Sequence, residues 1–176
     1  ADFTAPGAEG RYSVEKEVYL DLTERWRNVP KPTIAQVQGR CIAGGLMLVM
    51  ACDLVVASDN AAFCDNTVDL GVCGVEFFNH PYDFGIRKAK ELLFTAGWIN
   101  AQEAAATGFI NRVVPLAELE TATLGMARVI AAKPRFALKM AKEAINAAHD
   151  AMGRPQATST IFALHQLCHS HNMQVY

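Results

Sequence analysis

A pair of glycines between an expected strand and an expected helix offers the clearest chemistry in this sequence. Residues 33–37 form a short, mostly apolar run that Gly39 stops, which predicts a buried strand. Ala43-Gly44-Gly45 follows, and then the unbroken apolar segment 46–51, which predicts a buried helix. A helix N-terminus has N–H groups without helical partners and the positive end of the helix dipole. We therefore expect a site for an anion or a developing oxyanion at Gly44.

A second stretch, residues 65–80, combines two glycines with acidic and histidine side chains among apolar ones. A long irregular segment of this kind inside a compact domain is typical of a functional loop. Glu76 stands between Val75 and Phe77, and an apolar setting raises the pKa of a carboxyl toward the range useful for proton transfer. Two alternatives are equally open: Glu76 caps the helix near Pro81, or it forms an ion pair with Arg87.

Other polar residues of this loop are weaker candidates. Asp65 and Asp69 are more typical of loop aspartates that bond the local backbone. His80, before a proline, is a candidate proton carrier but is more typical of a helix entry.

Three histidines near the end of the chain, His165, His169 and His171, raise the question of a metal site. His165 and His169 are four residues apart and so share one face of a helix. No carboxylate nearby completes a ligand set. We expect a polar helix end or a subunit contact here, and no metal.

Composition narrows the class of protein. The 176 residues are 51% hydrophobic, which fits one globular domain. Their net charge of −2 lacks the basic excess that is typical of proteins binding nucleic acids or anionic membranes. No apolar run reaches the length of a membrane span, and we expect no signal peptide. The five cysteines lack any C-x-x-C pair and predict reduced thiols in a cytoplasmic protein.

The elements around these sites alternate between strands and helices. Residues 2–11 are expected to form a loop, and because no strand precedes them the chain is expected to begin within a larger fold. Ser13 caps an expected helix to Asn28, whose inward face carries Val14, Val18, Leu22 and Trp26. Further strands are expected at 53–58, 62–64 and 111–114.

The rest of the chain is expected to be mainly helical. Helices are expected at 84–95, after a capping box at Asn100 and Glu103, at 115–132, and beyond residue 155. Another expected helix ends near residue 148 and carries Phe136, Met140, Ala144 and Ala147 inward. The fold class is α/β.

Several ordered motifs then identify a family resemblance. K-P-T-I-A-x-V-x-G, A-G-G and C-D-L-x-x-A-S-x-x-A-x-F resemble the core of the crotonase (enoyl-CoA hydratase/isomerase) superfamily. L-L-F-T-A-G, A-x-E-A-x-x-x-G, I-N-R-V-V-P and K-P-x-x-A-L-x-x-x-K match it in order as well. The resemblance covers residues 29–150. It implies a spiral of ββα turns over residues 1–132, with its first turns missing, and C-terminal trimerisation helices over residues 133–176.

The resemblance also implies a role for the glycine pair. Family members stabilise a thioester enolate with two backbone N–H groups, and Gly44 stands where the second donor belongs, with Ala43 and Gly45 beside the substrate. The segment 3–9 resembles the loop of the first donor, but Pro6 has no N–H to offer. The first donor is therefore expected before Ala1.

The catalytic acids of the family's hydratases have no counterpart here. Their two glutamate positions hold Met47 and Thr67, which line the substrate site but cannot replace a pair of carboxylates. Other members place an acid further along the same loop, where this chain has Val75 at the counted position and Glu76 one residue later.

These residues lead to two hypotheses. The first is a cytoplasmic acyl-CoA-processing enzyme, homotrimeric or homohexameric, with Gly44 and Glu76 in catalysis and no cofactor beyond the coenzyme A of its substrate. The alternative is a non-catalytic CoA-binding or assembly homologue. A basic cluster near the penultimate helix either is a solvated face or approaches CoA phosphates: Lys133, Arg135, Lys139 and Lys142.

Overall fold

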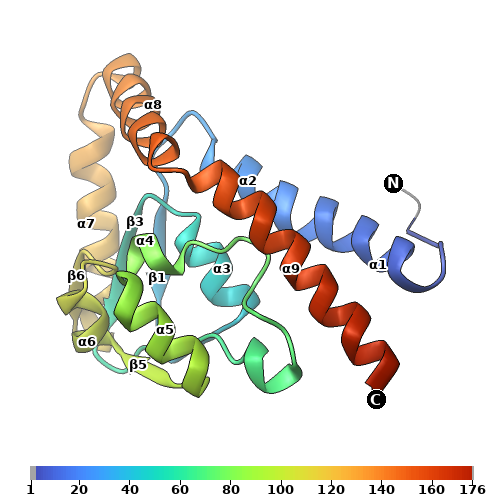
Figure 1. Ribbon diagram of the computed structural model, residues 1–176. Helices are drawn as coiled ribbons and strands as arrows, with labels where there is room; N and C mark the ends of the chain where they lie inside the picture. The colour runs from blue at the N-terminus through green and yellow to red at the C-terminus, as the bar shows by residue number, and fades with distance from the viewer. Residues whose placement is uncertain (1–2, 176) are drawn as a thin grey trace.

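The strands form two small sheets, and the first four strands alternate between them along the chain. The computed structural model describes residues 3–175 (Figure 1). In one sheet, β3 (Leu54–Ser58) lies between β1 (Ile34–Val37) and β6 (Arg112–Val114), all parallel. In the other, β4 (Ala62–Cys64) pairs in parallel with β2 (Arg40–Ile42) and antiparallel with β5 (Trp98–Asn100). Gly39, between β1 and β2, has a φ of 61°, a conformation that favours glycine and turns the chain from one sheet toward the other.

Helices surround both sheets, which confirms the α/β class. The predicted capping box is present at α6, where the Asn100 side chain accepts from the Glu103 N–H and the Glu103 side chain accepts from the Asn100 N–H. The helical elements are α1 (Gly7–Val14), η1 (Glu15–Asp21), α2 (Leu22–Arg27), α3 (Gly44–Met50), η2 (Thr67–Leu70), α4 (His80–Asp83), α5 (Ile86–Thr95), α6 (Ala101–Ala106), η3 (Leu116–Glu118), α7 (Leu119–Ala131), α8 (Arg135–Ala151) and α9 (Arg154–Val175).

The N-terminal helix differs from its prediction in both start and face. It begins at Gly7, so residues 7–11 are helical rather than a loop, and the missing side chain at Gly10 lets the backbone of Ala5 pack against it. Its middle, η1, is a π-helix, whose i→i+5 hydrogen bonds add a residue to each turn. The predicted inward face is therefore rotated out: Val18 is 44% and Trp26 47% exposed, and the buried side chains of η1 and α2 are Glu15, Leu20, Thr23 and Arg27.

Helix α8 also presents a different face from the one predicted. Phe136 is 72% exposed and Ala144 and Ala147 are exposed, whereas Lys142 is buried. The Lys142 ammonium lies 2.8 Å from an Asp53 carboxylate oxygen and donates to the Lys31 carbonyl at 3.0 Å. An ion pair with the residue before β3, rather than an apolar stripe, thus orients this helix. Ile86 in α5 is likewise exposed.

Helix α9 crosses the N-terminal helix, so the first and last helices of the chain are in contact (Figure 1). Arg154, at the start of α9, binds both carboxylate oxygens of Glu24 at 2.6 and 3.0 Å and also Asp150 at 2.7 Å. These paired contacts fix where the helices cross. Within residues 3–175, no helix is both long and apolar enough to span a membrane.

Candidate active site

The glycine pair occupies the predicted place between a strand and a buried helix. Gly44 is the first residue of α3, whose first helical hydrogen bond runs from the Met47 N–H to the Ala43 carbonyl at 2.8 Å. The N–H groups of Gly44 and Gly45 therefore precede that bond and have no acceptor within the helix. A Cβ added to Gly44 would meet no atom within 4 Å, so the space beside this residue is open.

Ala43, just before the helix, holds an unusual backbone conformation. Its φ of 44° and ψ of −105° are rare for a residue with a side chain. Its N–H donates to the Cys64 carbonyl at 2.9 Å, which ties it to the end of β4. Backbone strain of this kind persists where the surrounding structure enforces it, often at functional sites.

Asp65, the residue after β4, organises the functional loop. Its carboxylate accepts from the Thr67 N–H and hydroxyl at 3.1 and 2.6 Å and from the Val75 N–H at 3.1 Å. Burial alone would raise the pKa of Asp65, but hydrogen bonds and charge from His80 outweigh it and lower that pKa. Asp65 thus bonds local backbone as predicted, and His80, at the start of α4, is its buried partner at 3.0 Å.

Glu76 is buried beside a histidine from the far end of the chain. Its side chain is 12% exposed, and its carboxylate lies 3.7 Å from Nε2 of His165 in α9. Burial raises the pKa of Glu76, which confirms the prediction from its apolar neighbours. The ion pair found for Glu76 is with His165 and not with Arg87, and Asn79 rather than Glu76 is the N-cap residue of α4.

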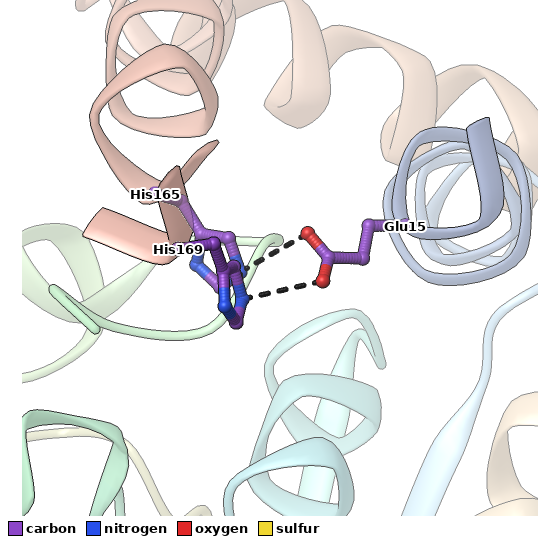
Figure 2. A group of neighbouring side chains, drawn as sticks. All are labelled: Glu15, His165 and His169. Atoms are coloured by element: carbon purple, nitrogen blue, oxygen red, sulfur yellow. Dashed lines mark hydrogen bonds and ion pairs between the residues drawn. The ribbon is translucent and has the colours of Figure 1, made fainter. Parts of the chain in front are cut away.

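Next to Glu76 lies a cluster that the sequence analysis missed. It consists of Glu15, His165 and His169 (Figure 2). Nε2 of His169 is 3.1 Å from Nε2 of His165 and 3.2 Å from one oxygen of Glu15, and the other Glu15 oxygen is 3.4 Å from His165. The expectation that no carboxylate joins these histidines is therefore wrong. Only the i, i+4 spacing of the histidines signalled this cluster, because Glu15 is 150 positions away and enters through the helix crossing.

The charges in the cluster are mutually adjusted. Burial would raise the pKa of Glu15, but hydrogen bonds from His165 and Gln166 lower it overall. Burial would lower the pKa of His165, but its bonds to Glu15 and to the Gly74 carbonyl raise it. The pKa of His169 is lowered, first by burial and then by the positive charges of His165 and Arg11. These opposite pKa shifts favour the proton on His165 over His169.

The two glutamate positions of the family's hydratases hold Met47 and Thr67, and the counted position of the later acid holds Val75. Met47 is 3% exposed and belongs to the hydrophobic core. The Thr67 hydroxyl donates to Asp65. Val75 is 3% exposed and contributes its N–H to the same carboxylate. None of the three offers a carboxylate.

An apolar cavity of about 780 Å³ borders the same loop. Loop residues Val68, Val72 and Phe78 form one wall, Leu93 and Phe94 of α5 another, and Cys168 of α9 a third. Such a cavity accommodates an apolar group rather than a charged one.

The four residues of the basic cluster differ in burial. Lys133 and Arg135 are exposed and Lys139 is half-buried, which leaves the solvated face and the CoA contact equally open for them. Lys142 is buried in its ion pair with Asp53, so it belongs to neither arrangement.

Comparisons with known proteins point in one direction. The family profile described as enoyl-CoA hydratase/isomerase matches residues 1–175. EchA13 of Mycobacterium tuberculosis, a protein assigned as an enoyl-CoA hydratase, is 47% identical over 169 residues, which are 96% of this chain and 53% of that protein. Methylmalonyl-CoA decarboxylase of Escherichia coli is 39% identical over 124 residues, 69% of this chain and 48% of that protein.

Solved structures agree with these sequences. The crystal structure of a probable enoyl-CoA hydratase from Mycobacterium thermoresistibile matches with a TM-score of 0.95 and 45% identity, over 98% of this chain and 73% of that one. A counterpart from Mycobacterium smegmatis matches with a TM-score of 0.95 and 47% identity, over 97% of this chain and 69% of that one. The chain spans about half the length of the two curated relatives.

Proposed function

This chain belongs to the enoyl-CoA hydratase/isomerase family, and from that premise we propose that it processes acyl-CoA thioesters through an enolate. The Gly44 N–H is one donor to the thioester oxygen, with Ala43 and Gly45 beside it. Preorganised donors aimed at a developing oxyanion supply a large part of the rate enhancement in such reactions. The open space beside Gly44 supports this role.

Glu76 is the proton carrier in this proposal. The observation that carries the assignment is that Glu76 and Gly44 are tied to the same strand end. The Ala43 N–H bonds the Cys64 carbonyl, and the next residue, Asp65, bonds the Val75 N–H directly before Glu76. Each of these links is a hydrogen bond of about 3 Å. The acid and the oxyanion donor are thereby held in fixed relation, as proton transfer to an enolate requires.

The reaction is not hydration by two glutamates, since Met47 and Thr67 occupy those positions. Isomerisation, hydrolysis, decarboxylation or an unusual hydration remain as classes. Decarboxylation needs an oxyanion hole and one proton delivered to the α-carbon after carbon dioxide leaves. A single carboxyl meets that need, and the Escherichia coli relative is named for such a reaction.

The apolar cavity beside the loop is the proposed site of the acyl group. One of its walls lies on the same loop that carries Glu76, so we propose that an apolar chain bound there extends from the reacting carbonyl. Coenzyme A enters as part of the substrate, and the proposed reaction needs no other cofactor.

A homotrimer or homohexamer in the cytoplasm is the proposed assembly. Large apolar side chains are exposed on the three C-terminal helices and in the turn between the last two, as a subunit interface would explain. Val129, Phe136, Ile145, Met152 and Leu167 are each more than 60% exposed. The cysteines, all free thiols, fit a reducing compartment.

The variant Glu76→Gln tests the catalytic assignment. We expect it to lower kcat/KM for the best substrate in a panel of enoyl-, dienoyl- and β-oxoacyl-CoA thioesters by about 100-fold or more, with little change in thioester affinity. Glu120→Gln, on the exposed face of α7, is the matched control and keeps full turnover. Unaltered turnover in Glu76→Gln refutes the assignment. Binding without turnover across the panel favours the non-catalytic alternative.

A further inference from the structure

We propose that Glu15, His165 and His169 form a binding site for a divalent metal ion of the zinc class. The three side chains come from two helices at opposite ends of the chain and converge on one point (Figure 2). Their candidate ligand atoms all lie within 4.8 Å of one another. This site stands on its own geometry and does not depend on the reaction proposed above.

The spacing of the ligand atoms suits tetrahedral coordination. Zinc binds imidazole nitrogen and carboxylate oxygen at about 2.0–2.1 Å, so neighbouring ligand atoms on a tetrahedron are about 3.3 Å apart. Nε2 of His165 and Nε2 of His169 are separated by 3.1 Å. Nε2 of His169 and the nearer oxygen of Glu15 are separated by 3.2 Å. Both separations are close to the edge of such a tetrahedron, and the other oxygen of Glu15 lies 3.4 Å from Nε2 of His165.

Surrounding groups hold two of the ligands in the orientation that a metal needs. Nδ1 of His165 lies 2.7 Å from the Gly74 carbonyl, to which it donates its proton, and this leaves Nε2 with a free lone pair. The oxygen of Glu15 that faces away from His169 accepts a hydrogen bond from the Gln166 amide. Metal-binding histidines and carboxylates characteristically have such secondary partners.

The electrostatics of the cluster require a positive centre. His165 and Glu15 are 3% and 8% exposed, and their facing atoms are hydrogen-bond acceptors when the imidazole is neutral. Acceptors buried this close repel each other unless a cation or a proton lies among them. The Glu15 carboxylate supplies negative charge that offsets part of the charge of a divalent ion. The positive charge of Arg11, close to His169, acts against the binding of a cation.

The donor set selects the class of ion. Two imidazole nitrogens and one carboxylate suit zinc and its neighbours in the first transition row, whereas magnesium and calcium prefer oxygen ligands throughout. With three protein ligands, a fourth position is open to water or a ligand, as in catalytic rather than structural zinc sites. The side chain of His169 is 27% exposed, so a metal ion would reach the site from solvent past this residue.

The local helix geometry gives independent support. Glu15 is the first residue of the π-helix η1, and π-helical turns are rare and often occur at functional sites. The wider turn rotates the predicted apolar face outward and leaves Glu15 buried toward α9. A carboxylate is thereby brought inside the protein, where an unpaired one would be costly.

Titration of the metal-free purified protein with Zn²⁺ and Co²⁺ tests the site. We expect one equivalent of Zn²⁺ to bind by calorimetry and to raise the Tm. Bound Co²⁺ is expected to give the intense visible absorption of a tetrahedral site. Glu15→Gln and His169→Asn are expected to weaken Zn²⁺ binding by more than about 100-fold, because losing a ligand costs more than losing a secondary partner. Glu17→Gln and His171→Asn, exposed on the same two helices, are the controls and keep full affinity.

The readouts separate this proposal from the catalytic one. Absence of a stoichiometric Zn²⁺ equivalent in the wild-type protein, or equal affinity in Glu15→Gln and Glu17→Gln, overturns the metal site. Where a ligand variant does not fold, the Co²⁺ spectrum of the wild-type protein decides. Neither measurement uses a thioester substrate, so loss of turnover in Glu76→Gln and loss of metal in Glu15→Gln are scored independently.

Discussion

Nε2 of His80 lies 3.0 Å from a carboxylate oxygen of Asp65, and both side chains are almost completely buried. The same oxygen accepts from the Val75 N–H, and the other accepts from Thr67. One carboxylate therefore fixes the beginning, middle and end of the loop that carries Glu76. Its position decides where the proposed proton carrier lies.

Asp65→Asn is expected to lower the free energy of unfolding by about 3 kcal/mol, because it leaves buried donors without an acceptor. Turnover of acyl-CoA should fall as well, since the loop loses its anchor before Glu76. Urea denaturation and steady-state kinetics measure the two effects. The control is Asp69→Asn, on the exposed side of η2, which should change stability by less than about 0.5 kcal/mol. Equal effects from both variants would contradict the anchoring role.

The lowered pKa of Asp65 gives this contribution a pH dependence. A carboxyl whose folded pKa lies below its ordinary value of 3.8 stabilises the protein above that value. The stabilisation is lost as the pH falls through the lower, folded pKa. We expect the stability difference between the wild-type protein and Asp65→Asn to shrink in acid below about pH 4, measured by urea denaturation across pH.

Lys142 is expected to act as a structural residue of α8. Its side chain is 7% exposed and pairs with Asp53, which also accepts from the Thr33 N–H and hydroxyl. Lys142→Ala should cost about 3 kcal/mol, because it breaks a largely buried pair. Lys139→Ala, one turn earlier in an exposed pair with Glu143, should cost about 0.5 kcal/mol or less. Chemical denaturation of the two variants measures the difference, and similar costs would refute the assignment.

Asp83 gives the stability of the protein a second pH dependence, opposite in sign to that of Asp65. Burial raises its pKa to about 7, although Asn79 donates to its carboxylate at 2.9 Å. Between the ordinary value of 3.8 and about 7, the folded chain holds a proton that the unfolded chain releases. Stability contributed by this group is therefore present at low pH and lost as the pH rises through that window.

Asp83→Asn is expected to remove this pH dependence of the stability. Its Tm relative to the wild-type protein is expected to be higher at pH 8 than at pH 5, because the variant has no charge to bury. Asp59→Asn, at an exposed position after β3, should follow the wild-type profile at both values. Thermal denaturation across pH decides, and parallel profiles for Asp83→Asn and the wild-type protein would contradict the prediction.

Features set by neighbouring residues were predictable from the sequence. The capping box needs only Asn100 and Glu103, and β3 needs only its apolar run, so both were located correctly. The loop at 65–80 and the raised pKa of Glu76 also follow from local composition. The ordered sequence motifs identified the family resemblance, and that resemblance predicted the fold.

Features set by contacts between distant residues were not predictable. The apolar spacing of Val18 and Trp26 assumes 3.6 residues per turn, and the π-helix breaks that assumption. Lys142 is buried because Asp53 meets it across the fold, which no helical period reveals. Glu15 joins His165 only because two helices cross, so the acidic member of that cluster had no local signal.

Gly44 offers a test of the oxyanion site that leaves the fold intact. A Cβ at this position meets no atom within 4 Å, so Gly44→Ala should have a Tm close to that of the wild-type protein. The methyl group would occupy the open space beside the N–H, where the thioester oxygen is proposed to bind. We expect kcat/KM to fall by about 10–100-fold, because small displacements at the reacting centre cost this much. Gly125→Ala in α7, also with open space around its Cβ, should keep full turnover and gain up to about 1 kcal/mol of stability. Full turnover in Gly44→Ala with an unchanged Tm would place the oxyanion site elsewhere.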